Sequence, residues 1–569
     1  MKKSKLNMAA DIFFPVALVI YSLLLVNQGI TVTDTGYNYA NFVNFHSLDN
    51  MWKFSTYYAT ALGYFFTRLP GGMTLLGLNI YTGLIKTAIA LCIYYACVKG
   101  LKLRKDLTFF AELVALGFCW CPTALIYNYL TYLLFNLGAF LLLMAVRDEK
   151  PKYYVLAGVA LGFNVLVRLP NLAEMALIFA LWFCCIFKKI PFVDILKKTG
   201  LCIAGYAAGL LVGLLGIFIK HGPSAYFDGI LRMISMPSDN GAYTVGSMVM
   251  NMYYNYRNNL KWLLLACCFV VLGTLFYLIV GKKIPMVKKI LFTLASLSII
   301  AIYYKCGVFN LSYYNYSSMY TIGIIFLMMS GAMALYVMFF GKEDHVFRMH
   351  AMIAGILIVV TPLGSNNVQY SSLNNLFLVM PFVLECIRRL FLFCRQAQKK
   401  PGRFSAEPLL IVLSVLTLFT AVQGVLFGAC FVFRDGTNGE KRIAQVADNS
   451  VLVHMVTNEK NAAELSDLNA YLTAEGLKGS EALLYQDVPG LSFFMDLKPA
   501  ISTVWPDLDS FSGEVFDQEL SALEASGSKP PVITGKIEDE TNPKVQRLRQ
   551  YLQTLGYEQT YDKGYSVYR

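Results

Sequence analysis

Residues 188–219 read KKIPFVDILKKTGLCIAGYAAGLLVGLLGIFI, a lysine-rich segment followed by a long run without charged residues. A helix rises about 1.5 Å per residue, so about 20 apolar residues cross the ~30 Å hydrocarbon core of a bilayer. The run from 199 to 219 therefore predicts a transmembrane helix. The lysines before it predict a cytoplasmic loop, because Lys and Arg are retained on that side of the membrane.

The same kind of apolar run recurs along the chain, which has 569 residues, is 56% hydrophobic and 15% charged, and has a mean hydropathy of +0.52. This composition is far more apolar than that of an ordinary soluble domain. The sequence predicts an all-α membrane protein with about thirteen transmembrane helices. The predicted spans are 9–29, 73–98, 107–125, 128–146, 153–169, 171–187, 199–219, 261–280, 287–304, 318–340, 347–363, 375–394 and 407–431.

The connecting segments alternate in character, which predicts their side of the membrane. Short basic segments, including the N-terminus, hold 26 of the 35 basic residues that precede the tail. The other segments are aromatic and rich in Asn, and two of them are long, the first outer loop 30–72 and the outer loop 220–260. The pattern predicts a multi-pass plasma-membrane protein with a cytoplasmic N-terminus and, after an odd number of spans, an extracytoplasmic C-terminal domain.

The sequence divides into a polytopic domain, residues 1–431, and a tail, residues 432–569. In the tail, 482–486 and 530–535 have the pattern of buried strands, and 514–526 and 544–556 have helical apolar spacing, which predicts a small α/β domain. From Arg434 onward the tail has 13 basic and 21 acidic residues, so the net charge of +12 arises in the membrane part. Nucleic acid is therefore not an expected partner, whereas membrane lipids are.

Acidic residues are scarce in the predicted outer segments, and Asp34 is the best placed of them. It lies in TVTDTGYNYANF (31–42), directly after the first span and beside a glycine and two tyrosines, one of which is Tyr37. A carboxylate at this water boundary suits a general base, and we take Tyr37 as a substrate contact. The alternative is that Asp34 only caps the helix that follows it.

Basic residues on the side that the positive-inside bias depletes indicate an anion to be bound, and arginine offers phosphate a planar, bidentate fork. The alternatives are snorkelling to the interface for the arginines, a structural role for the histidine, and, for loop 220–260, a segment that only closes the outer surface. Its stretch FDGILRMIS (227–235) has an interfacial character. The predicted substrate-binding residues besides Tyr37 are Arg68, Arg168, Lys220, His221, Arg232, Asp239 and Arg257.

This layout resembles the GT-C superfamily of membrane glycosyltransferases, especially the bacterial protein O-mannosyltransferase-like and aminoarabinose-transferase-like enzymes. The resemblance lies in TDTGY around Asp34, in Arg168-Leu169-Pro170-Asn171, and in the tail segments LLYQDVPGLSFFMDLKPAISTVWPD (483–507) and PPVIT (530–534). It implies a GT-C-like fold, a polyprenyl-phosphate-linked sugar as donor, a glycan, lipid or protein acceptor in the cell envelope, and inverting transfer with Asp34 as the base.

The sequence leaves two questions open: whether a metal is needed, and whether the protein is an enzyme or a transporter. Family members often have Asp-Glu where this chain has Asp34-Thr35; no cofactor is assigned, and a divalent metal stays an open alternative. A multi-span transporter or lipid flippase for a glycolipid or polysaccharide precursor would also need many spans, but its usual internal repeat is not visible and Lys86 is the main midplane ionisable residue. A polysaccharide polymerase or ligase would use similar donors with different loops.

Overall fold

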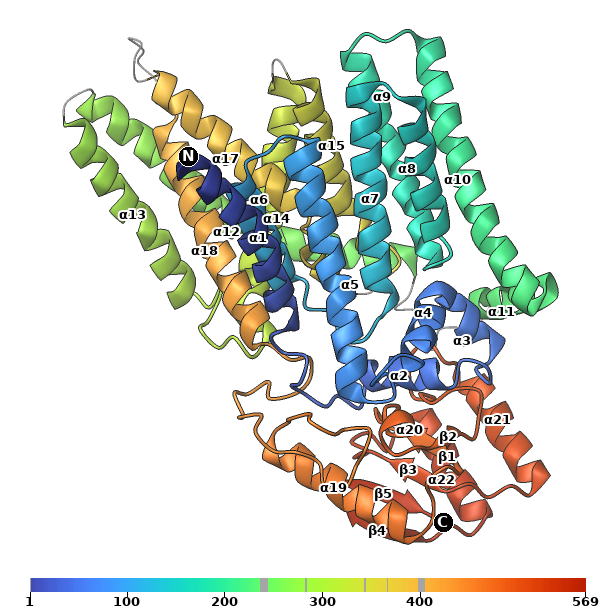
Figure 1. Cartoon of the computed structure of the whole chain (residues 1–569). Coiled ribbons are helices and arrows are strands. Elements are labelled where there is room, and N and C mark those ends of the chain that lie inside the picture. Colours follow the sequence, from blue (N-terminus) through green and yellow to red (C-terminus); the bar gives the residue numbers. More distant parts are fainter. Residues whose placement is uncertain (1, 236–243, 282–283, 342–343, 366, 398–404) are drawn as a thin grey trace.

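The computed structural model describes residues 2–235, 244–281, 284–341, 344–365, 367–397 and 405–569. Figure 1 shows a bundle of long helices with a smaller domain, which contains the C-terminus, packed against one end. Each predicted span overlaps one helix of this bundle, with ends that differ by up to seven residues except at the start of the helix that contains 261–280. The helices are α1 (Lys2–Leu23), α5 (Leu75–Tyr95), α6 (Lys105–Phe118), α7 (Tyr127–Asp148), α8 (Pro151–Asn164), α9 (Leu177–Phe187), α10 (Phe192–His221), α12 (Val245–Val280), α13 (Pro285–Lys305), α14 (Tyr320–Phe340), α15 (His345–Val360), α17 (Val379–Ala397) and α18 (Glu407–Cys430).

The bundle has the surface of a multi-pass membrane protein. Within the described residues, eight helical segments are long and apolar enough to cross a bilayer, and the apolar helices Ala10–Leu23 and His345–Val360 are shorter. Ile219 and Ile279 are 86% and 85% exposed, at the ends of α10 and α12. Apolar side chains left this open favour contact with lipid over contact with water. Lengths alone do not establish thirteen crossings, so that number stays a prediction.

Both long predicted loops are largely helical. Segment 30–72 folds into α2 (Asp34–Val43), α3 (Asn50–Ser55) and α4 (Tyr57–Thr67). In segment 220–260, α11 (Pro223–Ser235) lies across the end of α10, and α12 begins at Val245 (Figure 1). Thr244 caps α12 through its hydroxyl, which accepts from the Ser247 amide, so this helix extends well before the apolar run that revealed it. Shorter helical segments are η1 (Ala96–Gly100), η2 (Leu169–Ala176), η3 (Tyr316–Ser318) and α16 (Tyr370–Asn374).

Helices α8 and α10 pack backbone against backbone. A Cβ built on Gly158 would lie 2.1 Å from the carbonyl oxygen of Cys202, and one built on Gly209 would lie 2.2 Å from that of Val159. Gly162 and Gly205 are equally close to the opposite backbone, so each helix contributes two glycines four residues apart. Small residues at this spacing allow membrane helices to approach closely.

The C-terminal domain is an α/β unit, and its four predicted elements are all present. Its sheet has the order β2-β1-β3-β5-β4; β1 is parallel to β2 and β3, and β5 is antiparallel to β3 and β4. Strands β2, β4 and β5 were not predicted; β2 has only two residues, and β4 is mostly exposed and lacks an apolar pattern. The elements are α19 (Glu459–Ala474), β1 (Glu481–Tyr485), α20 (Leu491–Phe494), β2 (Lys498–Pro499), α21 (Gly513–Ser526), β3 (Val532–Thr534), α22 (Pro543–Thr554), β4 (Gln559–Lys563) and β5 (Tyr565–Tyr568).

A buried carboxylate joins this domain to the bundle. Asp435 is 3% exposed and accepts hydrogen bonds from the Ile30 amide at 2.8 Å, from the Thr457 hydroxyl at 2.5 Å and from the Asn458 side chain at 2.9 Å. It thereby fixes the segment that leads from α1 into α2 against the chain that leaves α18. The first residues of α2 are consequently placed between the bundle and the domain.

Candidate active site

Helix α2 carries the predicted base and is held on both sides. On the bundle side, Tyr39 donates from its hydroxyl to the Asn79 side-chain oxygen of α5 at 2.7 Å and also contacts the Thr123 carbonyl. On the domain side, the Gly490 amide donates to the Val32 carbonyl at 2.6 Å. The helix begins at Asp34, with Thr33 in the cap position. Asp34 therefore lies within the first helical turn, one residue beyond the cap position expected for it in the alternative interpretation.

The carboxylate of Asp34 is set between charges from two other parts of the chain. Burial raises its pKa above the usual range, the nearby Arg434 guanidinium lowers it, and the Asp487 carboxylate raises it. Arg434 follows α18 and lies 4.0 Å from the Asp487 carboxylate. Asp34 itself forms no direct ion pair in the described part of the chain. A partly buried carboxylate that is not neutralised by a direct partner has the basicity that a general base requires.

Asp487 lies in a tight turn at the carboxyl end of β1. Gln486 and Asp487 both have a left-handed backbone, with φ of 67° and 57°. Their amides donate to the Asp507 carboxylate at 3.0 and 2.8 Å, so one carboxylate fixes the turn. The carboxyl ends of parallel strands are a common place for ligand sites in α/β domains. Here that edge of the sheet meets the start of α2.

Aromatic rings surround the start of α2. Tyr37 contacts Trp505 of the C-terminal domain edge to face at 5.4 Å, and burial raises the pKa of Tyr37 to about 12. On the bundle side, Tyr316 contacts Trp120 at 4.6 Å and Phe431 at 4.8 Å, and the charges of both Asp34 and Arg434 act on it. Flat aromatic faces of this kind suit the apolar faces of a sugar ring or a polyprenyl chain.

A cavity of about 60 Å³ lies next to the aromatic wall formed by Trp120, Tyr316 and Phe431. Lys86 of α5 lines this cavity. Trp120 and Phe431 belong to both the cavity and the wall, so the two are continuous. Lys86 forms no ion pair or hydrogen bond within the described residues. The remaining lining includes Thr82, Cys121 and Tyr129. An ammonium group in a polar cavity, without a carboxylate, is placed to receive an anion.

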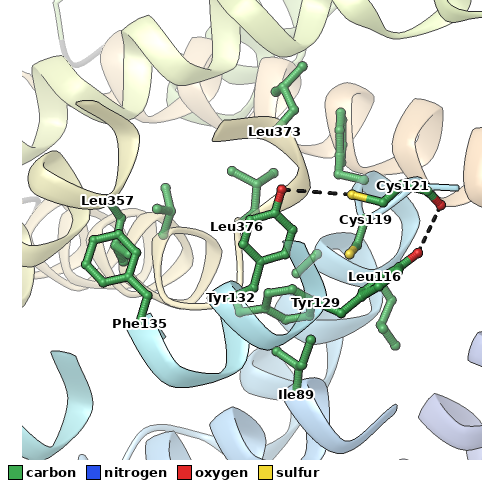
Figure 2. Close-up of a cluster of buried hydrophobic side chains, with 14 of the residues drawn as sticks. Ile89, Leu116, Cys119, Cys121, Tyr129, Tyr132, Phe135, Leu357, Leu373 and Leu376 are labelled. Atoms are coloured by element: carbon green, nitrogen blue, oxygen red, sulfur yellow. Dashed lines mark hydrogen bonds between the residues drawn. The ribbon is translucent and has the colours of Figure 1, made fainter. Parts of the chain in front are cut away.

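Hydrogen bonds hold the cavity wall where the chain passes from α6 to α7. Figure 2 shows Cys121 held by two tyrosines of α7. The Tyr129 hydroxyl donates to the Cys121 carbonyl at 2.9 Å, and the Tyr132 hydroxyl lies 3.9 Å from the Cys121 sulfur. In the same view Leu376 lies next to the Tyr132 ring, and Phe135 lies beside Leu357. Cys121 is thus a buried structural contact.

The predicted substrate-binding residues do not form one site. Tyr37 lies one turn from Asp34. Arg68, Lys220 and His221 gather near the opposite end of α2, around Tyr64, Phe45 and Tyr57. Arg168 bonds to the Gly364 carbonyl and lies over the Tyr127 ring, 4.9 Å from its centroid. The location of a basic residue in a predicted outer loop is therefore a weak guide to whether it shares a site with the others.

Two of the remaining predicted residues have structural partners, and one is outside the described residues. Arg232 pairs with Asp49 at 3.2 Å and with Asp228 at 3.1 Å, so its guanidinium is already occupied. Arg257 of α12 lies over the Tyr254 ring, 4.9 Å from its centroid. Asp239 falls within 236–243 and lies outside the residues that the structure describes.

Arg434 and Asp487 were not predicted as site residues. Arg434 lies 400 residues after Asp34 in the sequence, and only the docking of the tail brings them together. A signal was present, because Arg434 is the first basic residue after the last predicted span. Lys86 was noticed as an ionisable residue within a span, but the sequence did not reveal the cavity beside it.

The residues at this junction are a poor donor set for a divalent metal. The carboxylates at this junction are those of Asp34, Asp487 and Asp507; the Arg434 guanidinium acts on the first two, and two backbone amides occupy the third. A resident cation in that position competes with a metal for the same oxygens. Within the described residues, no three His, Cys, Asp or Glu side chains gather closely enough to form a metal site.

The sequence matches no protein-family profile and no curated protein. Among solved structures, the chain is similar to the oligosaccharyltransferase of Archaeoglobus fulgidus, determined in complex with zinc and sulfate. The sequence identity is 12% and the TM-score is 0.47, and the alignment covers 92% of this chain and 68% of that one.

Proposed function

We propose that this protein is an integral membrane glycosyltransferase of the GT-C kind, which transfers a sugar from a polyprenyl-phosphate donor to an acceptor of the cell envelope. The observation that carries the proposal is the position of Asp34, an unpaired carboxylate beside Arg434 at the junction of the bundle and the domain. In the proposed orientation the junction lies on the extracytoplasmic side, where lipid-linked sugars are the available donors.

In the proposed reaction, an acceptor hydroxyl attacks the anomeric carbon from the face opposite the phosphate. Asp34 takes the hydroxyl proton as the new carbon–oxygen bond forms, and the bond to the phosphate oxygen breaks with its electron pair leaving on the phosphate. The anomeric configuration is inverted. General-base assistance of this kind contributes ~10²–10⁴-fold. A phosphate leaves as a stabilised anion, so one carboxylate is sufficient.

In the proposed reaction, two cations stabilise the departing phosphate. Arg434 lies beside the base, and Lys86 lines the cavity that continues from the aromatic wall into the bundle. Preorganised positive charge that faces the developing negative charge lowers the barrier of such a step. Arg68, Lys220 and His221 lie near the far end of the ten-residue helix α2, about 15 Å from its start, and are assigned no part in this step.

The experiment is a transfer assay with purified protein in lipid nanodiscs. A panel of radiolabelled sugars on polyprenyl phosphate is offered together with an extract of envelope glycans, lipids and proteins, and the anomeric configuration of the product is determined by NMR. The proposal predicts transfer with inversion. Retention of configuration would contradict the single-displacement mechanism. Uptake of a donor into sealed vesicles without bond formation would instead support a transporter or flippase.

A further inference from the structure

A second group of basic side chains lies away from Asp34, near the far end of α2. The chain between α2 and α3, helix α3, the end of α4 and the end of α10 bring these side chains together around the rings of Phe45, Tyr57 and Tyr64. We call this group the basic cluster. Its members are His46, Lys53, Arg68, Lys220 and His221.

Lys53 is the buried member of the basic cluster and lacks a carboxylate of its own. The residue is 6% exposed, and its ammonium donates one long hydrogen bond, 3.4 Å, to the His46 carbonyl. The nearest acid, Asp49, caps α3 by accepting from the Met51 amide at 2.8 Å and pairs with Arg232 at 3.2 Å. A buried ammonium without an anion is costly, so this position is better suited to a protein that has an anion bound.

The other members are held in place by aromatic groups and open to the surface. The Tyr64 hydroxyl accepts from Arg68 at 2.6 Å and lies 2.9 Å from His46, and Lys220 lies over the Phe45 ring, 5.0 Å from its centroid. None of these three makes an ion pair in the described part of the chain. The Phe45 and Tyr64 rings stack with their centroids 5.3 Å apart, so Arg68 and Lys220 lie on the same pair of rings, and neither cation is neutralised by a carboxylate.

Helix α11 indicates where this position lies relative to a bilayer. It follows His221 after Gly222 and crosses the end of α10 (Figure 1). Its Phe227, Leu231 and Ile234 are 52%, 64% and 68% exposed and share one face. The charged Asp228 and Arg232 lie beside that face, and Tyr226, Gly229 and Ile230 are buried against the protein. A helix of this kind lies in the interface, at the depth of lipid headgroups. The basic cluster is consequently at the level of lipid phosphates.

We propose that the basic cluster binds the phosphate headgroup of an anionic membrane lipid, at a site separate from Asp34. The proposal does not depend on the glycosyltransferase reaction. It requires only that the bundle lie in a membrane, because the ligand is held by Lys53 from the buried side and by Arg68 and Lys220 from the surface.

The test measures lipid binding to the full-length protein purified in a zwitterionic detergent. Phosphatidic acid, phosphatidylcholine and inorganic phosphate are added separately, and binding is followed by native mass spectrometry and by the shift in melting temperature. We expect phosphatidic acid to bind saturably at one site, at least about 10-fold more tightly than phosphatidylcholine. Equal affinity for the two lipids, or binding of inorganic phosphate as tight as that of phosphatidic acid, would overturn the proposal.

Variants assign the binding to the cluster. The pair R68Q/K220Q should weaken phosphatidic acid binding at least about 10-fold. The matched control pair R257Q/K261Q also removes one arginine and one lysine that lie over aromatic rings, and it should leave binding unchanged. Lys53→Met tests the buried position separately: it should raise the melting temperature without lipid and abolish the stabilisation by phosphatidic acid. Unchanged binding in both R68Q/K220Q and Lys53→Met would overturn the proposal.

Discussion

Gly36 of α2 packs directly on Gly490 of the C-terminal domain. A Cβ built on Gly36 would lie 2.3 Å from the Gly490 Cα, and one built on Gly490 would lie 2.9 Å from the Gly36 Cα. Contact between two glycines allows the turn that carries Asp34 to approach the loop that carries Asp487. The tail therefore contributes Arg434 and Asp487 to the candidate site.

This contact predicts the effect of a single methyl group. Gly36→Ala should force α2 and the Gly490 loop apart and lower sugar transfer by about 10-fold or more, since small displacements of reacting groups have large effects on rate. Gly200→Ala is the control, because a Cβ there meets nothing within 4 Å. Transfer rates and melting temperatures of both variants check this prediction. Equal transfer by the two variants would show that the close approach is not needed.

The pH dependence of transfer should report the surroundings of Asp34. The base must be ionised, so the rate falls as the pH decreases through its pKa, which burial holds above the usual carboxylate range. Arg434 lowers this pKa and Asp487 raises it. Arg434→Gln should therefore move the acid limb of the pH–rate profile to higher pH, and Asp487→Asn should move it to lower pH. Shifts in the same direction would contradict the assigned neighbours.

The same raised pKa predicts a change in stability. A carboxyl group whose pKa is higher in the folded state gives stability that is present below its unfolded pKa, usually about 3.9, and is lost as the pH rises through the folded value. At neutral pH, ionised Asp34 thus destabilises the fold. Asp34→Asn should melt at the same or a higher temperature than the wild type at pH 7. A clearly lower melting temperature would indicate that the carboxylate is a structural contact.

Removing the Asp435 carboxylate should lower the stability of the fold, because it accepts three hydrogen bonds that join the C-terminal domain to the bundle. Asp435→Ala leaves the Ile30 amide and the Thr457 hydroxyl without their acceptor and should cost about 1–3 kcal/mol or more, since the group removed is charged. Asp509→Ala, at an exposed position of the same domain, is the control. Thermal unfolding in detergent measures both. Equal melting temperatures of the two variants would show that the hydrogen bonds to Asp435 contribute little to stability.

The cavity beside Lys86 predicts a defect that concerns the donor. Lys86→Gln keeps a polar group but removes the charge, so it should raise the KM for the lipid-linked donor or lower kcat, with the KM of the acceptor unchanged. Steady-state kinetics with each substrate varied in turn separates these effects. A selective change in the acceptor KM would place the acceptor, and not the phosphate, beside Lys86.

The sequence was sufficient for features that depend on local pattern. Apolar runs predicted the helices of the bundle, and the position of Asp34 after the first span predicted a candidate base near the surface of the bundle. Patterns spread over a few residues also predicted β1 and β3. These features follow from burial and periodicity, which neighbouring residues determine.

Features that depend on how the C-terminal domain packs on the bundle could not be predicted from local pattern. Arg434 and Asp487 reach Asp34 only because Asp435, Gly36 and Gly490 join distant segments. Arg232 was expected to bind substrate, but the fold gives it Asp49 and Asp228 as partners. A basic residue in an outer loop is therefore free or occupied according to contacts that the sequence does not state.

The central claim is that Asp34 is the base of a glycosyl transfer, and the most direct measurement is the single-turnover rate of Asp34→Asn. The account predicts a loss of at least ~10²-fold relative to the wild type, with unchanged donor binding, whereas the control Asp509→Asn transfers at the wild-type rate. A wild-type rate for Asp34→Asn would contradict the account.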